Sequence, residues 1–172
     1  YIDCDTHYFP VKFLEGISDK YPQSPRVVRN GDEVKSVLPD GTLIKNQAPK
    51  GRWHLDTRVQ QADWEGFDIH VLISENRELL YTWDRDLGCE LARAYNDAVA
   101  QDLKECAQPE RYLGVAWVFL PDVKESCREI ERAVKTLGLR AVKFMGGFKD
   151  ANLGAEKLWP LYDKICELDI PI

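Results

Sequence analysis

The sequence has no long hydrophobic run, no basic stripe and no closely spaced pair of cysteines. A membrane-spanning helix needs roughly 18 consecutive apolar residues, and no stretch approaches that length. The net charge of −6 argues against a nucleic-acid surface, because phosphate binding requires clustered Lys and Arg. We therefore expect neither a membrane nor a nucleic acid as a partner.

The five cysteines are widely spaced, odd in number and form no C-x-x-C pair. A disulfide framework or a cysteine-based zinc site is therefore not expected. Three of them, Cys106, Cys127 and Cys166, fall on the apolar faces of predicted helices. We interpret these as reduced core thiols of a cytoplasmic protein.

The 172 residues are 44% hydrophobic and 30% charged, which is typical of one globular domain. From residue 56 onward, apolar strand-like runs alternate with amphipathic helical patterns. Strands are predicted at 69–74, 112–120 and 140–145, with the start of another at 169–172. Helices are predicted from a cap at Asp56 to near Gly66, from Asp84 to before Pro109, from Asp122 to Gly138, and over 158–168.

This alternation implies a parallel sheet covered by helices, either an open doubly wound sheet or a (β/α)8 barrel. Four strand–helix units and the start of a fifth strand correspond to half a barrel. We therefore expect an α/β fold, the N-terminal half of a (β/α)8 TIM barrel, with residues 1–172 as one domain that is incomplete at its C-terminus. Unpaired strand edges would favour association, as a homodimer or a higher homo-oligomer.

Residues 8–55 interrupt the alternation. They contain the turn signals N-G in "RNGDEV" and D-G in "LPDGTLI", each flanked by strand-like residues. We expect a β-hairpin insertion after the first strand. Because loops after barrel strands lie on the catalytic face, this insertion either covers a site or is a surface decoration.

The first residues, "YIDCDTHYFP", place ionisable groups in a predicted strand. Alternation along the strand puts Asp3, Asp5 and His7 on one side, with Ile2 and Cys4 on the other. Asp5 and His7 would then point together from the carboxyl end of the strand. A carboxylate and an imidazole can bind one divalent cation, and the alternative is a polar strand end that meets solvent.

Other polar residues have two interpretations each. Asp3 either orients His7 as a hydrogen-bonded neighbour of the metal site or is a strand-end carboxylate. Either Lys143 or Phe144 faces the barrel interior, and a buried Lys there would need a partner. Trp83 follows the second strand, where it lines an aromatic substrate pocket or packs in the loop.

The opening stretch resembles the amidohydrolase-related proteins (amidohydrolase family 2), in the branch that contains aminocarboxymuconate-semialdehyde decarboxylase. Their first strand typically reads I-D-x-H-x-H-x-x-x-P, and Ile2, Asp3, His7 and a nearby Pro10 fit it. Asp5 stands where the first His usually is. The resorcylate-type decarboxylases are among the relatives that also carry a carboxylate there.

The resemblance continues along the chain in the same order as in the family. It covers "RVQQADWEGFDIHVLIS", "YTWDRD…AYNDAVAQ", "PERYLGVAWVFLPD" and "LWPLYDKICELDIPI". In the first of these blocks, Arg58, Asp63, Gly66 and Ser74 match the family pattern.

The resemblance implies a mononuclear divalent metal with Asp5 and His7 as two of its four ligands. A His on strand 5 and an Asp on strand 8, both expected beyond Ile172, would complete the set. His54 and His70 precede the third strand, so neither replaces that His, and we treat both as structural or surface residues. Zn²⁺ is the first expectation, and Mn²⁺ is the alternative because carboxylate ligands make the site harder.

The implied activity is metal-dependent decarboxylation (C–C bond cleavage) of a small aromatic or unsaturated carboxylic acid. Lys45 follows the D-G turn, where the family carries a substrate-binding Arg, and is either a carboxylate-binding residue or an exposed Lys. The residue that transfers the proton is expected beyond Ile172. Two alternatives stay open: a hydrolase of the same barrel family that uses a metal-bound hydroxide, and a non-catalytic α/β module.

Overall fold

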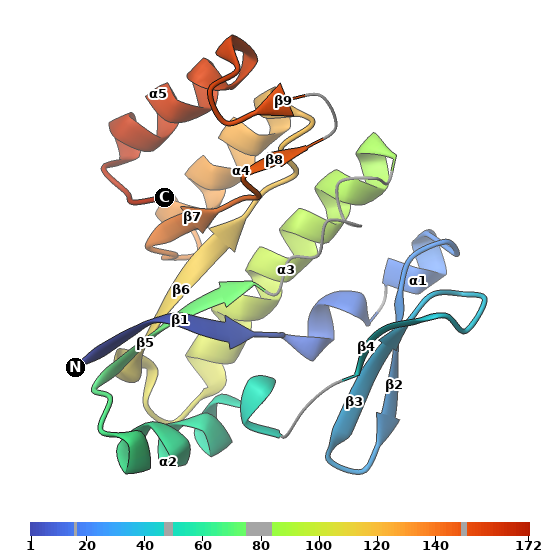
Figure 1. Cartoon of the computed structure of the whole chain (residues 1–172), viewed down its shortest axis with the longest axis vertical. Helices are drawn as coiled ribbons and strands as arrows, with labels where there is room; N and C mark the ends of the chain where they lie inside the picture. Colours follow the sequence, from blue (N-terminus) through green and yellow to red (C-terminus); the bar gives the residue numbers. More distant parts are fainter. Residues whose placement is uncertain (16, 47–49, 75–83, 149–150) are drawn as a thin grey trace.

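The computed structural model describes residues 1–15, 17–46, 50–74, 84–148 and 151–172. Its centre is a four-stranded parallel sheet in the order β1-β5-β6-β7 (Figure 1). The strands of this sheet are β1 (Ile2–Tyr8), β5 (Ile69–Ser74), β6 (Tyr112–Trp117) and β7 (Ala141–Lys143). The helices are α1 (Ile17–Lys20), α2 (Leu55–Glu65), α3 (Arg85–Glu105), α4 (Val123–Lys135) and α5 (Trp159–Leu168).

The strand order follows the chain order without a reversal. Right-handed crossovers between successive parallel strands then place every connecting helix on the same face of the sheet. A doubly wound sheet would reverse its order and carry helices on both faces. The sheet therefore has the topology of a barrel wall, as predicted.

Side-chain caps begin two of the long helices where the sequence predicted them. The carboxylate of Asp84 accepts a hydrogen bond from the amide of Leu87 at 2.9 Å, and Asp122 accepts one from Glu125 at 2.9 Å. The prediction for α2 was wrong by two residues, because its cap is His54 rather than Asp56. Asp56 instead accepts a hydrogen bond from a backbone amide beyond α3.

Strand β1 does not alternate uniformly. Asp3 pairs with His70 and Thr6 pairs with Leu72, so two residues of β1 stand opposite one residue of β5. Such a β-bulge shifts which side chains share a face. The prediction that Asp3 lies on the side of Asp5 and His7 is therefore wrong: Asp3 joins Thr6 and contacts His70.

Residues 26–46 form a second, antiparallel sheet of β2 (Arg26–Asn30), β3 (Glu33–Val37) and β4 (Leu43–Asn46). The turn between β2 and β3 contains Gly31, and the link to β4 contains Gly41; both glycines have the positive φ that these turns require. The predicted hairpin is thus confirmed, with β4 as a third strand. This sheet lies to one side of the parallel sheet (Figure 1).

Two predicted strands are shorter than expected. The third parallel strand ends at Trp117 rather than at residue 120, and the fourth covers Ala141–Lys143 rather than 140–145. Residues 170–172 have no strand assignment, but the amide of Val142 donates to the carbonyl of Pro171 at 3.1 Å. The last residues therefore run beside β7.

All five cysteines are free thiols. Cys106 and Cys127 are partly buried and pack against the core, whereas Cys166 is exposed. The interpretation of Cys166 as a core residue is therefore wrong. Within the described residues, no helix is both long enough and apolar enough to cross a membrane.

Candidate active site at the carboxyl end of the sheet

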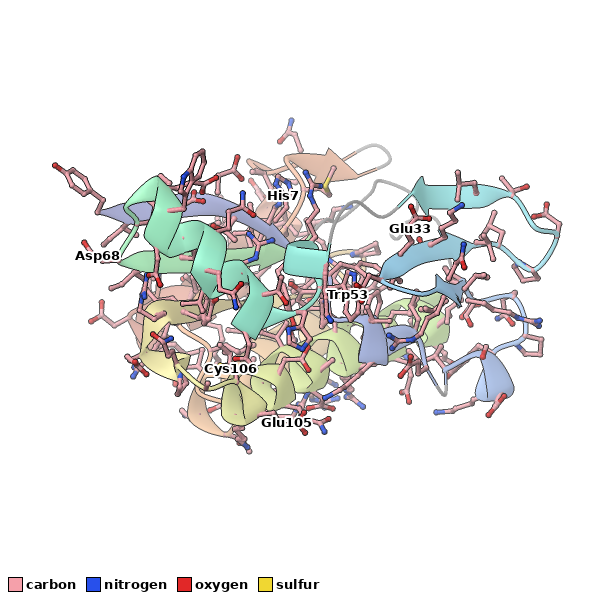
Figure 2. The ribbon with its side chains drawn as sticks, turned by 90° about the horizontal axis from the view of Figure 1, so that it is seen from below. His7, Glu33, Trp53, Asp68, Glu105 and Cys106 are labelled. Carbon is pink, nitrogen blue, oxygen red and sulfur yellow. The ribbon has the colours of Figure 1, made fainter. Side chains whose placement is uncertain are left out.

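The side chains of Asp5 and His7 lie next to each other near the carboxyl end of β1. Nδ1 of His7 is 3.9 Å from Oδ1 of Asp5, and the two side chains are 45% and 79% exposed. Figure 2 shows His7 at the end of β1 away from the amino terminus. The predicted pair is therefore brought together on one side of the strand, accessible to a ligand.

Lys143 extends toward the same end of the sheet from β7. Its Nζ donates to the backbone carbonyl of Ser74 at 3.0 Å, at the last residue of β5. Burial lowers the pKa of Lys143, and the nearby Asp5 carboxylate opposes that shift. The sequence left open whether Lys143 or Phe144 faces the interior. Phe144 is buried and packs against Tyr162 of α5, whereas Lys143 is partly buried and reaches Ser74 across the sheet.

A cavity of about 330 Å³ lies along β1. Asp3, Asp5, Thr6 and His7 line it from the strand. His70 lines it from β5, and Arg58, Gln61 and Glu65 line it from α2. Within the described residues β1 is an edge strand of the parallel sheet, so the cavity follows an edge that no other described strand covers.

Asp3 lines the same cavity but makes its side-chain hydrogen bond with Thr6 rather than with His7. Thr6 donates its hydroxyl proton to Asp3 at 2.6 Å, and Nδ1 of His70 lies 2.8 Å from the same hydroxyl. Since a hydroxyl has one proton, His70 is the donor in the second bond and carries its proton on Nδ1. Burial by itself would raise the pKa of Asp3, but the hydrogen bonds from Thr6 and the amide of Asp5 lower it below its usual value.

The structure does not place the side chains of the other two residues predicted to bind substrate, Lys45 and Trp83. Lys45 lies on β4, paired with Ser36 of β3, but the structure does not describe its side chain. Trp83 lies outside the described residues. His54 caps α2 and His70 is buried at 3% side-chain exposure, which agrees with the structural roles expected for both.

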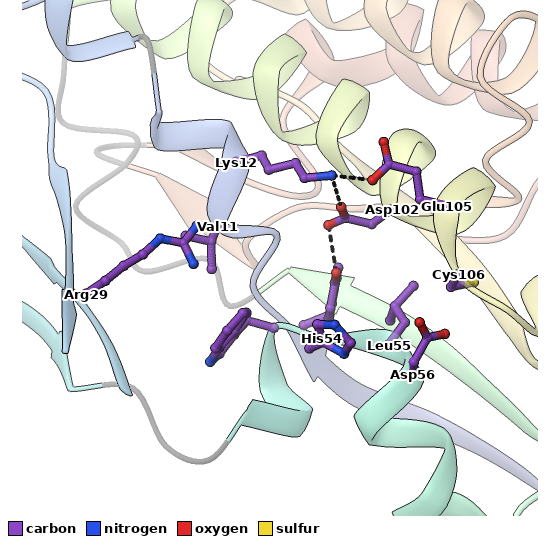
Figure 3. Close-up of a pocket in the computed structure, with 11 residues that line it drawn as sticks. Val11, Lys12, Arg29, His54, Leu55, Asp56, Asp102, Glu105 and Cys106 are labelled. Atoms are coloured by element: carbon purple, nitrogen blue, oxygen red, sulfur yellow. Dashed lines mark hydrogen bonds and ion pairs between the residues drawn. The ribbon is translucent and has the colours of Figure 1, made fainter. Parts of the chain in front are cut away.

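A second polar cavity, of about 340 Å³, lies on the helix side of the sheet (Figure 3). The hydroxyl of Tyr8 donates to Asp102 at 2.7 Å, and Lys12 bridges Asp102 at 3.1 Å and Glu105 at 2.5 Å. Burial, followed by the Asp102 carboxylate, raises the pKa of Tyr8. Lys12 offsets part of the charge of the two carboxylates, and these contacts join Tyr8 of β1 and the segment after it to α3.

The pair Asp5 and His7 suits a divalent metal in donor type. A carboxylate oxygen and an imidazole nitrogen are ligands of Zn²⁺ and of harder divalent ions, and both side chains reach the solvent. No group of three or more His, Cys, Asp or Glu side chains in the described part of the chain is placed to hold a metal. The described residues thus supply two donors, and a complete site needs further ligands.

Residues 2–172 match the Amidohydro_2 family, described as amidohydrolase. This chain belongs to that family. It is 27% identical over 169 residues to 2-amino-3-carboxymuconate-6-semialdehyde decarboxylase of Dictyostelium discoideum, covering 96% of this chain and 45% of the relative. It is 30% identical over 123 residues to gamma-resorcylate decarboxylase of Polaromonas sp., covering 67% of this chain and 37% of that protein.

A solved structure of the amidohydrolase family extends the comparison to the fold. It is a dihydroxybenzoic acid decarboxylase from Polaromonas sp. JS666, with bound manganese and the inhibitor 2-nitroresorcinol. The TM-score is 0.64 at 26% identity, over 99% of this chain and 47% of the other. The chain thus has the fold of the N-terminal half of a TIM barrel and spans less than half the length of the curated relatives it matches.

Two polar residues near this end of the sheet were not assigned a role from the sequence. Lys143 was recognised only as one of two residues that could face the interior. In so short a strand, the sequence does not show which alternate residues face inward. Arg58 was recognised only as part of a family-like block. Its guanidinium donates from Nη2 to the carbonyl of His7 at 2.9 Å, a contact between residues 51 positions apart that no local pattern signals.

Proposed function

We propose that this chain provides half of the active site of a metal-dependent decarboxylase that acts on a small aromatic or unsaturated carboxylic acid. The observation that carries the proposal is the adjacent pair of Asp5 and His7 at the carboxyl end of β1, in a chain of the amidohydrolase family. The relatives named above are decarboxylases of such acids, which supports this reaction over others that the same fold hosts.

Asp5 and His7 would hold the metal, together with ligands from outside this chain. When bound, a divalent metal supplies a Lewis acid that polarises an oxygen of the substrate. We propose Mn²⁺ or Zn²⁺. Manganese is bound in the related dihydroxybenzoic acid decarboxylase, and the oxygen donor of Asp5 favours a harder ion than a second His would.

Lys143 would bind the carboxylate of the substrate. Its ammonium group lies at the carboxyl end of the sheet, near Asp5, and an ammonium donor has three protons of which one goes to Ser74. A charged hydrogen bond would orient the carboxylate that leaves as CO2. The C–C bond breaks once the ring or diene carbon has received a proton, so the positioned carboxylate departs without its own proton.

Three further residues keep the roles that the sequence predicted, as proposals. Lys45 would contact the substrate carboxylate from the antiparallel sheet, and Trp83 would line an aromatic pocket after β5. Asp3 would support His7, although its observed hydrogen bonds to Thr6 and the amide of Asp5 favour the structural role. Substitution of Asp3 by Asn separates the two, because only a supporting role predicts weaker metal binding.

We also propose a cytoplasmic enzyme that forms a homodimer or a higher homo-oligomer. Five free thiols favour a reducing compartment. The exposed apolar side chains of Ile2, Trp64 and Leu113 favour association through apolar surface.

Metal analysis of the full-length protein that contains this chain tests the proposal. Plasma emission should find about one divalent metal per chain in the wild type and little in a variant with Asp5→Ala and His7→Ala. A matched control is Asp163→Ala, which removes an exposed carboxylate on α5 and should leave the metal content unchanged.

The reaction is then tested by CO2 release from 2,6-dihydroxybenzoate and 5-carboxyvanillate. Release that requires the metal supports the decarboxylase. Hydrolysis of phenyl esters without CO2 release would instead support the hydrolase alternative. A metal content that survives in the double variant would exclude Asp5 and His7 as ligands.

A further inference from the structure

The end of β1 that carries Asp5 and His7 is held from two directions besides its pairing with β5. The amide of Phe9, just after the strand, donates to the carbonyl of Arg52 at 3.0 Å. Arg58, in the first turns of α2, donates from Nη2 to the carbonyl of His7 itself at 2.9 Å. The second contact is the one made by a side chain, so it can be removed by substitution.

Arg58 has few other uses in the described part of the chain. Its Nε is buried and finds no hydrogen-bond partner among the described residues. Burial lowers the pKa of Arg58, an Arg nonetheless stays charged in proteins, and the carboxylate of Asp3 lies close enough to favour that charge. The partly buried guanidinium of Arg58 thus hydrogen bonds to the backbone of His7, a predicted metal ligand.

We propose that Arg58 is a positioning residue for the metal site, acting through the carbonyl of His7. This inference rests on the proposed function, because it assumes that His7 is a ligand. By fixing the His7 carbonyl, Arg58 sets the orientation of the peptide plane that follows His7. That orientation helps to keep the imidazole next to the carboxylate of Asp5. Groups that hydrogen bond to the side chains of metal ligands change metal affinity about 10- to 100-fold when removed, and we expect an effect of that order for Arg58.

Arg111 offers a matched control. It also donates to backbone carbonyls, from Nε to Asp68 at 2.6 Å and from Nη2 to Phe67 at 2.7 Å. Those carbonyls lie just before β5, at the amino end of the sheet, far along the strands from Asp5 and His7. Its loss should therefore destabilise the fold without affecting a metal ligand.

The experiment compares Mn²⁺ affinity and thermal unfolding in the full-length protein for Arg58→Met, Arg58→Lys and Arg111→Met. We expect the Kd for Mn²⁺ to rise about 10- to 100-fold in Arg58→Met and less in Arg58→Lys, whose ammonium can reach one acceptor without the planar geometry of Arg. Arg111→Met should lower the Tm measured with chelator and keep the Kd within about two-fold of wild type.

Two results would overturn the inference while leaving the proposed function intact. One is a Kd within about two-fold of wild type in both Arg58 variants, and the other is an equal loss of affinity in Arg111→Met. If Arg58→Met does not fold, Arg58→Lys decides, since it keeps the charge and the aliphatic stem. A wild-type protein that binds no Mn²⁺ or Zn²⁺ would instead remove the proposed function and this inference with it.

Discussion

Strand β1 carries two groups of similar polar side chains that are used differently. In the first group, Asp3 and His70 both hydrogen bond with the hydroxyl of Thr6. In the second group, Asp5 and His7 lie side by side with their side chains 79% and 45% exposed. Figure 2 labels His7 near the carboxyl end of β1 and Asp68 at the opposite end, where Asp68 pairs with the amino terminus of Tyr1.

The difference teaches how to distinguish a structural polar cluster from a candidate site within one strand. Buried polar groups that satisfy one another stabilise the fold, because each would cost free energy if left without a partner. Asp5 and His7 are ligand-type groups that lie together with their side chains exposed to solvent. Composition alone does not separate the two groups, since each contains an Asp and a His.

The largest expected effect is the loss of decarboxylation when His7, at the carboxyl end of β1, is replaced. In His7→Ala, the decarboxylation rate should fall about 1,000-fold, which corresponds to roughly 4 kcal/mol of lost transition-state stabilisation. The Tm of the metal-free protein should stay close to wild type, because the side chain is nearly half exposed. Steady-state CO2 release and thermal unfolding with chelator measure both quantities. A large loss of Tm would place His7 among the structural residues.

The next effect concerns the ammonium group at the same end. Lys143→Met should raise KM for the carboxylic acid about 10- to 100-fold, because a charged hydrogen bond contributes about 1.5–3 kcal/mol. The metal content should not fall, since Lys143 is not a ligand. KM for a neutral analogue that lacks the carboxylate serves as the control, and an equal rise for both compounds would contradict the assignment.

A smaller effect concerns the hydrogen bonds that join Asp3, Thr6 and His70. Thr6→Val should lower the free energy of unfolding by about 2 kcal/mol, because it leaves the buried Nδ1–H of His70 without an acceptor and removes the donor to Asp3. Denaturant unfolding of the metal-free protein measures this. The Kd for Mn²⁺ should be unchanged, and weaker Mn²⁺ binding would mean that these hydrogen bonds and the Asp5–His7 pair are coupled.

The smallest effect is a pH dependence of stability from His70. Burial lowers the pKa of His70 below 6.5, the usual value, with Asp3 opposing the shift. The imidazole of His70 therefore binds a proton more readily in the unfolded chain than in the folded one. The free energy of unfolding should be highest above about pH 6.5 and should fall as the pH drops below that value toward the lowered pKa. Unfolding at several pH values should show a flatter dependence in His70→Gln than in wild type.

Much of the fold could be predicted because its signals are local. Asp84 and Asp122 cap their helices as expected, since a cap involves only the next three residues. The cap of α2 was missed because His54 is not a favoured cap residue and Asp56, two positions later, is. The turns at Gly31 and Gly41 were predictable for the same local reason.

The candidate site could be predicted only in part. Asp5 and His7 were found because two residues separated by one share a strand face. The bulge that turns Asp3 away depends on pairing with β5, and the bond from Arg58 joins elements distant in the chain. Neither leaves a trace in local spacing, so both required the structure.

The bulge at Cys4 and Asp5 divides β1 into two segments whose pleats are out of phase. If all seven residues alternated regularly, Asp3 would fall on the same side as His7. With the bulge, Asp3 hydrogen bonds with Thr6, while Asp5 lies beside His7. Deletion of Cys4 would leave one residue opposite Val71, so Asp3 should still pair with His70 and keep its bond with Thr6 in a strand that is now regular.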